Sequence, residues 1–361
     1  MKNRFLALLV KILAIAAAVS VVQALGLMCL GYNVPGKIIN NLTNRLKSPE
    51  LHESEEDMAN YPAKLRDLGV FDNEPEEALP QTVVYKLLTD HFSAPLPQGK
   101  TVKKAMVLGY DGFRADAIGY VMEEEESGIM RIKSRGGKLY HAFAGGIPGQ
   151  NEQRTVTGPG FLTIFSGGWA DYHGVYDNSS VKNDCEALFT EFPRQGVRTL
   201  FVAAWAPLFT TIYRPDLTLA VKERLPLRFQ RTEGDFETYA LVVRQLLQSG
   251  GANQALEPDT DIDAFFVLLH STDDAGHSNG FYQNPNYVES CKLTDAIGYD
   301  ILEAIESRET YAQEDWLTII VTDHGGYENH HGGQSVVERS IWLAVNQAVP
   351  MTEEYLKYAR K

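Results

Sequence analysis

The feature that most limits the fold of this chain is a repeated alternation of short apolar runs with longer helical patterns. The apolar runs have the length of buried strands and lie at 105–109, 199–204, 264–269, 317–321 and 341–345. Apolar residues recur at helical spacing over 236–248 and 286–306. Strands that alternate with helices predict an α/β domain with a mostly parallel central sheet covered on both faces, a three-layer α/β/α sandwich.

The N-terminus carries a targeting signal ahead of this domain. Lys2 and Arg4 precede an apolar stretch, and 12–30 contains no charged residue. That length is close to the roughly 20 residues needed to cross a bilayer core. We therefore expect residues 1–31 to be a membrane anchor with an exported catalytic domain, or, as the alternative, a cleaved signal peptide of a secreted protein. Residues 32–100 read as a spacer or lead-in, and 101–361 as the catalytic domain.

Composition narrows the range of partners. The formal net charge of −14 repels polyanions, so binding to a nucleic-acid polymer is not expected. A small anionic substrate remains compatible, because a bound cation reverses the local field. Three cysteines are too few for a disulfide scaffold or a cysteine-based metal site. Cys185 and Cys291 either form one bridge or remain free thiols, and the sequence does not decide between these states.

Acidic residues and histidines follow the expected strands. Asp111 comes two positions after the first run, and Asp273 with His277 follows the third at a spacing that places both on one side of a helical turn. Asp323 and His324 come just after the fourth run and before two glycines, which let the chain twist so that both side chains converge. Ligands of parallel sheets bind outside the carboxyl ends of the strands, where these residues fall.

The density of metal-ligand residue types there exceeds that of an ordinary solvated turn. Five of the nine histidines lie between His270 and His331, and the pair His330-His331 follows His324 closely. Aspartates and histidines together suit zinc, which binds mixed oxygen and nitrogen ligands. We expect two divalent cations, with zinc favoured by the ligand set and manganese as the alternative.

A candidate nucleophile precedes the apolar stretch 161–165. Pro159 suits the first turn of a helix, which would put Thr157 at the positive N-terminal end. A threonine there is by default an N-cap. The neighbouring metal ligands make it a candidate nucleophile, since metal coordination is one way to activate a hydroxyl.

Six motifs in one order make the chain resemble the type I phosphodiesterase/nucleotide pyrophosphatase branch of the alkaline phosphatase superfamily. The resemblance covers about 103–349, and the motifs are 110–112, 157–160, 169–178, 273–277, 323–325 and 331–333. It implies one metal ion held by Asp111, Thr157, Asp323 and His324, and a second held by Asp273, His277 and His331. His331 is preferred to His330 because it directly precedes the glycine pair.

The resemblance also implies a reaction and further roles. Thr157 would attack phosphorus and form a phosphothreonine that water hydrolyses, while Asn178 would hydrogen-bond a phosphoryl oxygen. His173 and His270 are assigned to packing or to supporting the ligands. The substrate would be a small phosphate ester, but Gly160-Phe161 stands where nucleotide pyrophosphatases often have Asn-His, which leaves nucleotide specificity open. Sulfate ester hydrolysis is not expected, because a sulfatase needs cysteine or serine at the position of Thr157.

Three alternatives remain. A membrane-anchored phosphoethanolamine or phosphoglycerol transferase would use the same threonine and metal ions and pass the group to a lipid or glycan. A phosphomonoesterase would differ only in the ester that it cleaves. An inactive, metal-stabilised binding ectodomain is disfavoured because no ligand position is lost.

Overall fold

The computed structural model describes residues 53–249 and 261–361, which belong to one compact unit. The expected anchor or signal peptide at 1–31 lies outside the described residues. Within the described residues, no helix has the length and apolar character needed to cross a bilayer.

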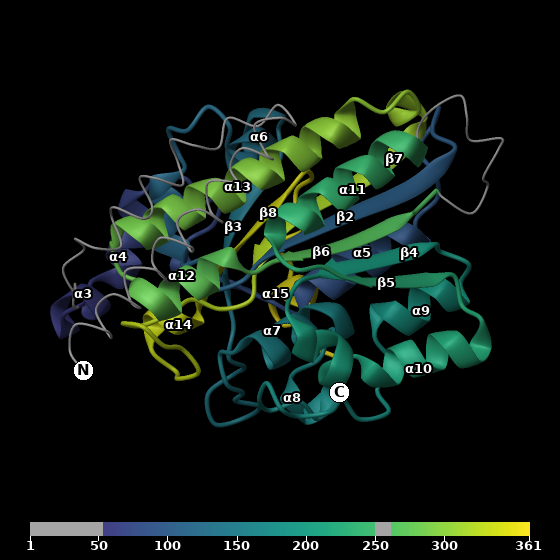
Figure 1. Ribbon diagram of the computed structural model, residues 1–361. Helices are drawn as coiled ribbons and strands as arrows, with labels where there is room; N and C mark the ends of the chain where they lie inside the picture. Colours follow the sequence, from purple (N-terminus) through teal and green to yellow (C-terminus); the bar gives the residue numbers. More distant parts are fainter. Residues whose placement is uncertain (1–52, 250–260) are drawn as a thin grey trace, which may run out of the picture. The chain divides into compact units, whose positions relative to one another are not determined.

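One sheet runs through the described part of the chain, in the order β1-β3-β8-β7-β2-β6-β4-β5 (Figure 1). Strand β8 is antiparallel to β3 and β7, whereas the remaining neighbours pair in parallel. The mostly parallel sheet expected from the sequence is therefore confirmed. The strands are β1 (Leu79–Pro80), β2 (Val102–Tyr110), β3 (Lys138–Phe143), β4 (Thr199–Ala203), β5 (Leu227–Arg231), β6 (Ala264–Leu269), β7 (Glu314–Thr322) and β8 (Ser340–Val345).

Alternate residues of the central strands face opposite hydrophobic clusters. In β2, Met106 and Leu108 join one cluster, whereas Ala105 and Val107 join the other. This is the period of two expected for a strand that is buried on both faces. A sheet with two apolar faces must be covered on both.

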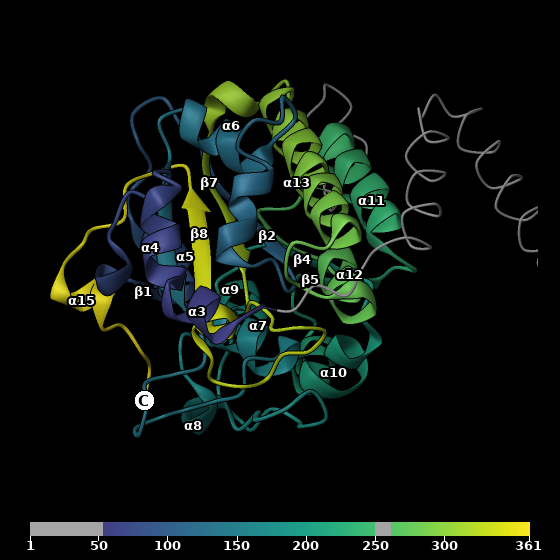
Figure 2. The same ribbon diagram turned by 90° about the vertical axis from the view of Figure 1, so that its left-hand side faces the viewer.

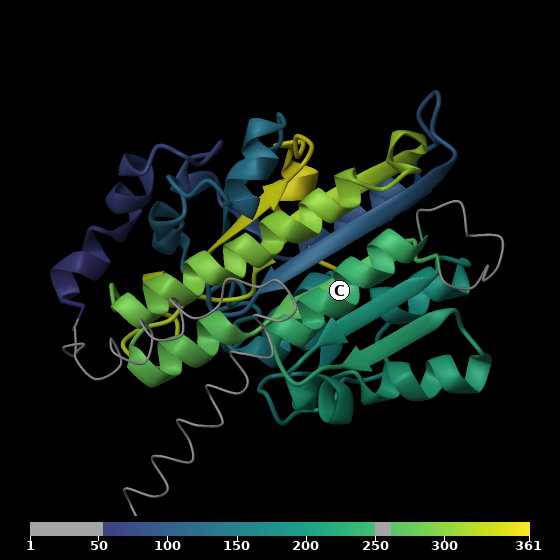
Figure 3. The same ribbon diagram turned by 45° about the horizontal axis from the view of Figure 1, so that its top comes forward.

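Four helices cover the first cluster. Two of them, α11 (Asp235–Ser249) and α13 (Pro285–Glu306), lie along the sheet in Figure 3 and stand beside it in Figure 2. The longer of these two, α13, begins after Asn284, whose side chain accepts a hydrogen bond from the N–H of Asn286, and it buries Ile301 and Ile305. The four helices are α4 (Tyr61–Asp67), α6 (Gly128–Ser134), α11 (Asp235–Ser249) and α13 (Pro285–Glu306).

The second cluster is covered by α5 (Val83–Ser93), α7 (Thr157–Ser166) and α9 (Leu188–Arg194). Helices therefore cover both faces. The remaining described elements are short: α3 (Glu55–Ala59), η1 (Pro75–Glu77), η2 (Ala115–Tyr120), α8 (Ala170–His173), the π-helical turn η3 (Leu208–Ile212), α10 (Arg214–Glu223), α12 (Ser271–Asn279), η6 (Tyr311–Gln313), α14 (Val336–Arg339) and α15 (Glu353–Leu356).

Strands β1, β3 and β5 have no counterpart among the five apolar runs. Strand β5 lies at an edge of the sheet and is largely exposed, so it needs no continuous apolar sequence. Strand β1 has two residues, and β3 is interrupted by His141. Both β1 and helices α3 to α5 come from the stretch expected as a lead-in.

Candidate metal centre and active site

Three central strands end at the same level of the sheet, which brings their next residues together. Tyr110 at the end of β2 pairs with Leu269 of β6 and with Thr322 of β7. The residues that follow these three are Asp111, His270 and Asp323. Strand register alone therefore brings together Asp111 and Asp323, which lie more than two hundred positions apart in the sequence, with His270 beside them.

Three histidines turn the same ring atom, Nε2, toward the carboxylates of Asp111, Asp273 and Asp323. The Nδ1 atoms of His277, His324 and His331 each contact a backbone carbonyl, those of Asn329, Gly325 and Thr155, at 3.0, 2.8 and 3.0 Å. Their Nε2 atoms are thereby directed at the aspartates. Histidines that bind metals show this pattern, because a hydrogen bond at one nitrogen fixes the ring and leaves the other as the ligand.

The Nε2 atoms lie close to carboxylate oxygens. His324 Nε2 is 3.3 Å from both Asp111 Oδ1 and Asp323 Oδ2. His277 and His331 lie 3.4 and 3.3 Å from the two oxygens of Asp273, and their Nε2 atoms are 3.0 Å apart. Helix α12 carries Asp273 and His277 one turn apart, as their spacing predicted.

The ligand-type atoms form overlapping groups. Atoms within 4.8 Å of one another come from Asp273, His324 and His331, from Asp111, Asp323 and His324, and from Asp111, His270 and Asp273. Because each group shares members with another, the residues form one continuous cluster. His330, by contrast, is exposed and packs against Tyr327.

The charges of the cluster favour a cation. Asp111, Asp273 and Asp323 are at most 3% exposed, and burial together with the nearby Asp111 raises the pKa of Asp323 well above its ordinary value. Among the described residues, Asp273 Oδ1, Asp323 Oδ2 and His324 Nε2 make no hydrogen bond and have only the 3.3 Å contacts within the cluster. Three buried carboxylates this close together are costly to ionise unless a cation neutralises them. The donor set and its orphaned atoms therefore fit a metal ion.

Thr157 presents its hydroxyl to this cluster. It is the first residue of α7, and the N-cap is Val156, which makes no side-chain capping bond. The default capping role of Thr157 is thus excluded. The side chain is buried, and Oγ1 donates to Asp111 Oδ1 at 3.4 Å. Its hydroxyl therefore makes no capping hydrogen bond and lies beside the candidate ligand Asp111.

Glycines let the start of α7 approach its surroundings closely. A Cβ at Gly160 would lie 3.0 Å from Cβ of Asp323, and one at Gly158 would lie 3.0 Å from Oδ1 of Asn178. The N–H of Gly158 donates to that Asn178 oxygen at 2.7 Å. Since the oxygen faces Gly158, the amide nitrogen of Asn178 is the group left to donate elsewhere.

The remaining sequence candidates take structural places. His173 is buried and contacts Thr163 Oγ1 through Nε2, in agreement with a packing role. Cys185 and Cys291 are both free thiols. Trp205 and Asp235, which the sequence reading did not single out, contact His270 near the cluster. Their only signal was position, Trp205 just beyond β4 and Asp235 at the first residue of α11.

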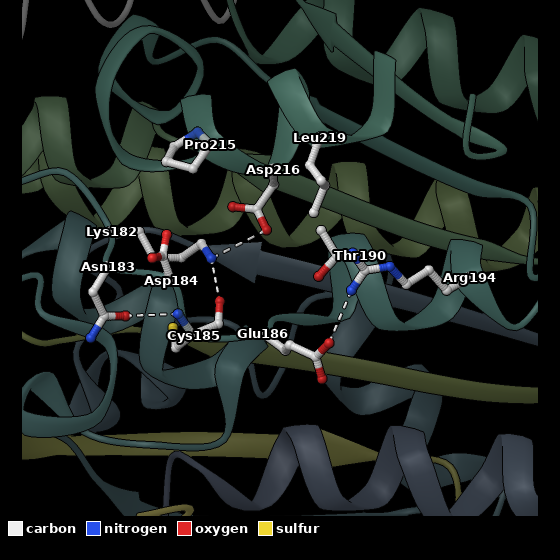
Figure 4. Close-up of a pocket in the computed structure, with 10 residues that line it drawn as sticks. All are labelled: Lys182, Asn183, Asp184, Cys185, Glu186, Thr190, Arg194, Pro215, Asp216 and Leu219. Atoms are coloured by element: carbon white, nitrogen blue, oxygen red, sulfur yellow. Dashed lines mark hydrogen bonds and ion pairs between the residues drawn. The ribbon is translucent and has the colours of Figure 1, made fainter. Parts of the chain in front are cut away.

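A separate cavity of about 370 Å³ lies between α9, α10 and the loop after Asn178 (Figure 4). Lys182 reaches into it and lies 3.5 Å from Asp216 Oδ1, and burial raises the pKa of Asp216 to about 6. None of the candidate metal ligands lines this cavity.

Comparison with known families decides the assignment. A family model described as type I phosphodiesterase/nucleotide pyrophosphatase matches residues 105–357. The chain belongs to this family. The match confirms the family expected from the six motifs and agrees with the expected enzyme class, a phosphoester hydrolase. The family is metal-dependent, in keeping with the Asp and His cluster.

More distant likenesses exist among solved structures. Murine ectonucleotide pyrophosphatase/phosphodiesterase 5, in an inactive form with AMP, is 16% identical with a TM-score of 0.45, and the human protein is 17% identical with a TM-score of 0.45. Each match covers 62% of this chain and 57% of the other. A 2-O GAG sulfatase is 10% identical with a TM-score of 0.48, over 69% of this chain and 66% of that one. No curated protein sequence gives a significant match.

Proposed function

We propose that this protein is a metal-dependent phosphoric ester hydrolase that cleaves a small phosphodiester or nucleotide pyrophosphate through Thr157. The observation that carries the proposal is the buried Thr157 hydroxyl, 3.4 Å from Asp111, beside three histidines that all turn Nε2 toward buried aspartates. A hydroxyl that makes no helix-capping bond and lies beside candidate metal ligands has the arrangement that nucleophilic phosphoryl transfer needs.

The residues divide into two ligand sets. Asp111, Thr157, Asp323 and His324 would hold one divalent cation, and Asp273, His277 and His331 would hold the other, with zinc as the preferred ion. When bound, such cations supply positive charge that lowers the pKa of the nucleophile and neutralises the phosphoryl oxygens.

The chain's own groups carry the bond changes. Thr157 Oγ1 forms a bond to phosphorus while the bond to the leaving oxygen breaks, and the hydroxyl proton lies within reach of Asp111 Oδ1. The leaving oxygen departs as an alcohol or phosphate after taking up a proton. Water then bonds to phosphorus, the phosphothreonine bond breaks, and one proton returns to Oγ1. Asn178 would donate its amide N–H to a phosphoryl oxygen throughout.

We also propose a cellular setting on the basis of the N-terminal sequence. Residues 1–31 would anchor the protein, or be removed from it, and the catalytic domain would lie on the exported side of the membrane. A small phosphate ester is the expected partner. A protease-protection assay on intact cells tests the location: an accessible catalytic domain supports export, and a protected one contradicts it.

Substitution of Thr157 tests the reaction. Turnover of bis-p-nitrophenyl phosphate, p-nitrophenyl phosphate and a thymidine ester should fall by roughly 10⁴-fold or more in Thr157→Ala. Thr157→Ser should keep part of the activity and should yield a phosphorylated protein on acid quench. The matched control is Thr163→Val in the same helix, whose hydroxyl contacts Gln153 and His173 and not the cluster. Unchanged turnover in Thr157→Ala would refute the mechanism.

The same enzyme preparation separates hydrolysis from group transfer. Incubation with head-group-labelled phospholipid should release free phosphate or a phosphomonoester. Label that moves to an added alcohol, lipid or glycan in preference to water would instead assign the transferase alternative.

A further inference from the structure

His270 differs from the other histidines of the cluster in the atom that lies nearest to an aspartate, although its Nε2 is also 4.0 Å from Asp273 Oδ2. His277, His324 and His331 contact carbonyls through Nδ1. His270 instead places Nδ1 2.5 Å from Asp111 Oδ2. An ionised carboxylate only accepts hydrogen bonds, so the proton of this contact is on Nδ1. His270 therefore behaves as a hydrogen-bond donor to a candidate ligand, which is a different role from that of the other three.

The orientation of His270 is fixed on two sides. Both oxygens of Asp235 accept the backbone N–H of His270, at 2.9 and 3.0 Å, and Oδ2 also accepts the N–H of Ser271. The imidazole stacks on the indole of Trp205, with 5.9 Å between centroids and 24° between planes. The hydrogen bonds fix the backbone from which the side chain starts, and the stacked indole limits how the imidazole can turn, as a group that orients a ligand requires.

The two oxygens of Asp111 have different partners. Oδ2 accepts from His270, whereas Oδ1 lies 3.4 Å from Thr157 Oγ1 and 3.3 Å from His324 Nε2. A half turn about the Cβ–Cγ bond exchanges two equivalent oxygens and changes nothing, but a smaller rotation of the carboxylate would break the contact with His270. The hydrogen bond thus fixes the plane of the carboxylate, so that one oxygen stays on the side of the nucleophile.

We propose that His270 is a positioning residue that holds Asp111 with one oxygen directed at Thr157 and the adjoining metal site. The inference rests on the proposed function, because it assumes that Asp111 binds an ion. Carboxylate ligands are commonly oriented by such outer hydrogen bonds, and loss of one costs about 10- to 100-fold in metal affinity. Trp205 and Asp235 contact His270 and are not among the candidate ligands.

The test measures metal affinity without turnover. Wild type, His270→Ala and His270→Asn, as full chains, compete with a chromophoric chelator for Zn²⁺, and the two binding events are fitted separately. The Asn amide nitrogen can occupy the place of Nδ1 and donate to Asp111. The matched control is His330→Ala, which removes an exposed histidine near the cluster. Thermal melting of the metal-free proteins shows whether each variant folds.

His270→Ala should weaken one of the two binding events by about 10- to 100-fold, His270→Asn should restore much of that loss, and His330→Ala should match wild type. Equal affinities in wild type and His270→Ala would overturn the inference while leaving the proposed function intact. An equal loss in the Ala and Asn variants would also overturn it, since donation to Asp111 would not be what matters. If wild type bound no Zn²⁺, that result would instead contradict the proposed function.

Discussion

Asn178 accepts a hydrogen bond from the backbone N–H of Gly158, the residue after Thr157, with 2.7 Å between Oδ1 and N. The contact joins the loop after α8 to the first turn of α7. It occupies the oxygen of the amide and leaves the nitrogen to donate. Asn178 can therefore act on the reaction in two ways, by fixing the start of α7 and by contacting the substrate.

Two substitutions of Asn178 separate these roles. Asn178→Asp keeps an oxygen for Gly158 but loses the donor, whereas Asn178→Ala loses both. If the donor binds a phosphoryl oxygen in the transition state, both variants should lower kcat by about 10²- to 10³-fold, as measured with bis-p-nitrophenyl phosphate. Melting temperatures should fall more in the Ala variant. Near-normal kcat in Asn178→Asp would show that only the contact with Gly158 matters.

Removal of one buried carboxylate should change stability in opposite directions with and without metal. Asp323 is fully buried beside Asp111, and burial together with this neighbour raises its pKa. In chelator, Asp323→Asn removes a carboxyl group that is costly to ionise at this position, so the variant should be more stable than wild type by about 1 kcal/mol or more. With Zn²⁺, wild type should gain more stability than the variant, because it binds the ion more tightly. Denaturant unfolding in both conditions measures this, and a variant that is less stable in both contradicts the metal assignment.

Gly298 allows α13 to pack directly on β2. A Cβ there would lie 1.7 Å from the hydroxyl oxygen of Tyr110. Gly298→Ala should therefore reduce the free energy of unfolding by about 1–3 kcal/mol. Tyr110→Phe removes the colliding oxygen, so the double variant should be more stable than the sum of the single changes predicts, by about 0.5 kcal/mol or more. Strict additivity in a urea double-mutant cycle would show that the two residues do not collide.

Asp295 should make stability depend on pH between about 4 and 7. Burial raises its pKa to about 7, although hydrogen bonds from Ser127, the N–H of Ile129 and Tyr110 oppose the rise. The unfolded chain has the ordinary value of about 3.9, so the folded state binds the extra proton between these values. This contribution to stability is present below about pH 4 and is lost as the pH rises through 7, with a slope of at most about 1.4 kcal/mol per pH unit.

Asp295→Asn isolates that contribution. The variant cannot titrate at this position, so the difference in unfolding free energy between it and wild type should shift in favour of the variant as the pH rises from 5 to 8. Denaturant unfolding at several pH values measures the difference. A constant difference would mean that Asp295 has the same pKa in the folded and unfolded states.

The sequence predicted the inner strands because their burial on both faces demands apolar runs. Strands β2, β4, β6, β7 and β8 each coincide with one of these apolar runs. It did not predict β5, which is exposed at an edge, or the reversed direction of β8, because strand direction depends on the path of the connecting loops. Helices α11 and α13 were recognisable because each is long enough to repeat its apolar spacing.

The chemistry of the site could be predicted from the types of residue that follow the strands. Asp111, Asp273, Asp323 and their histidines could be named from the sequence, since few other positions combine these residues with strand ends. Only the tertiary structure decided which atoms meet. Strand register set Asp111 beside Asp323, and the Nδ1 contacts with backbone carbonyls turned three histidines inward. The sequence left His270 between packing and a supporting role, because Trp205 and Asp235, which contact it, come from elements that only packing brings together.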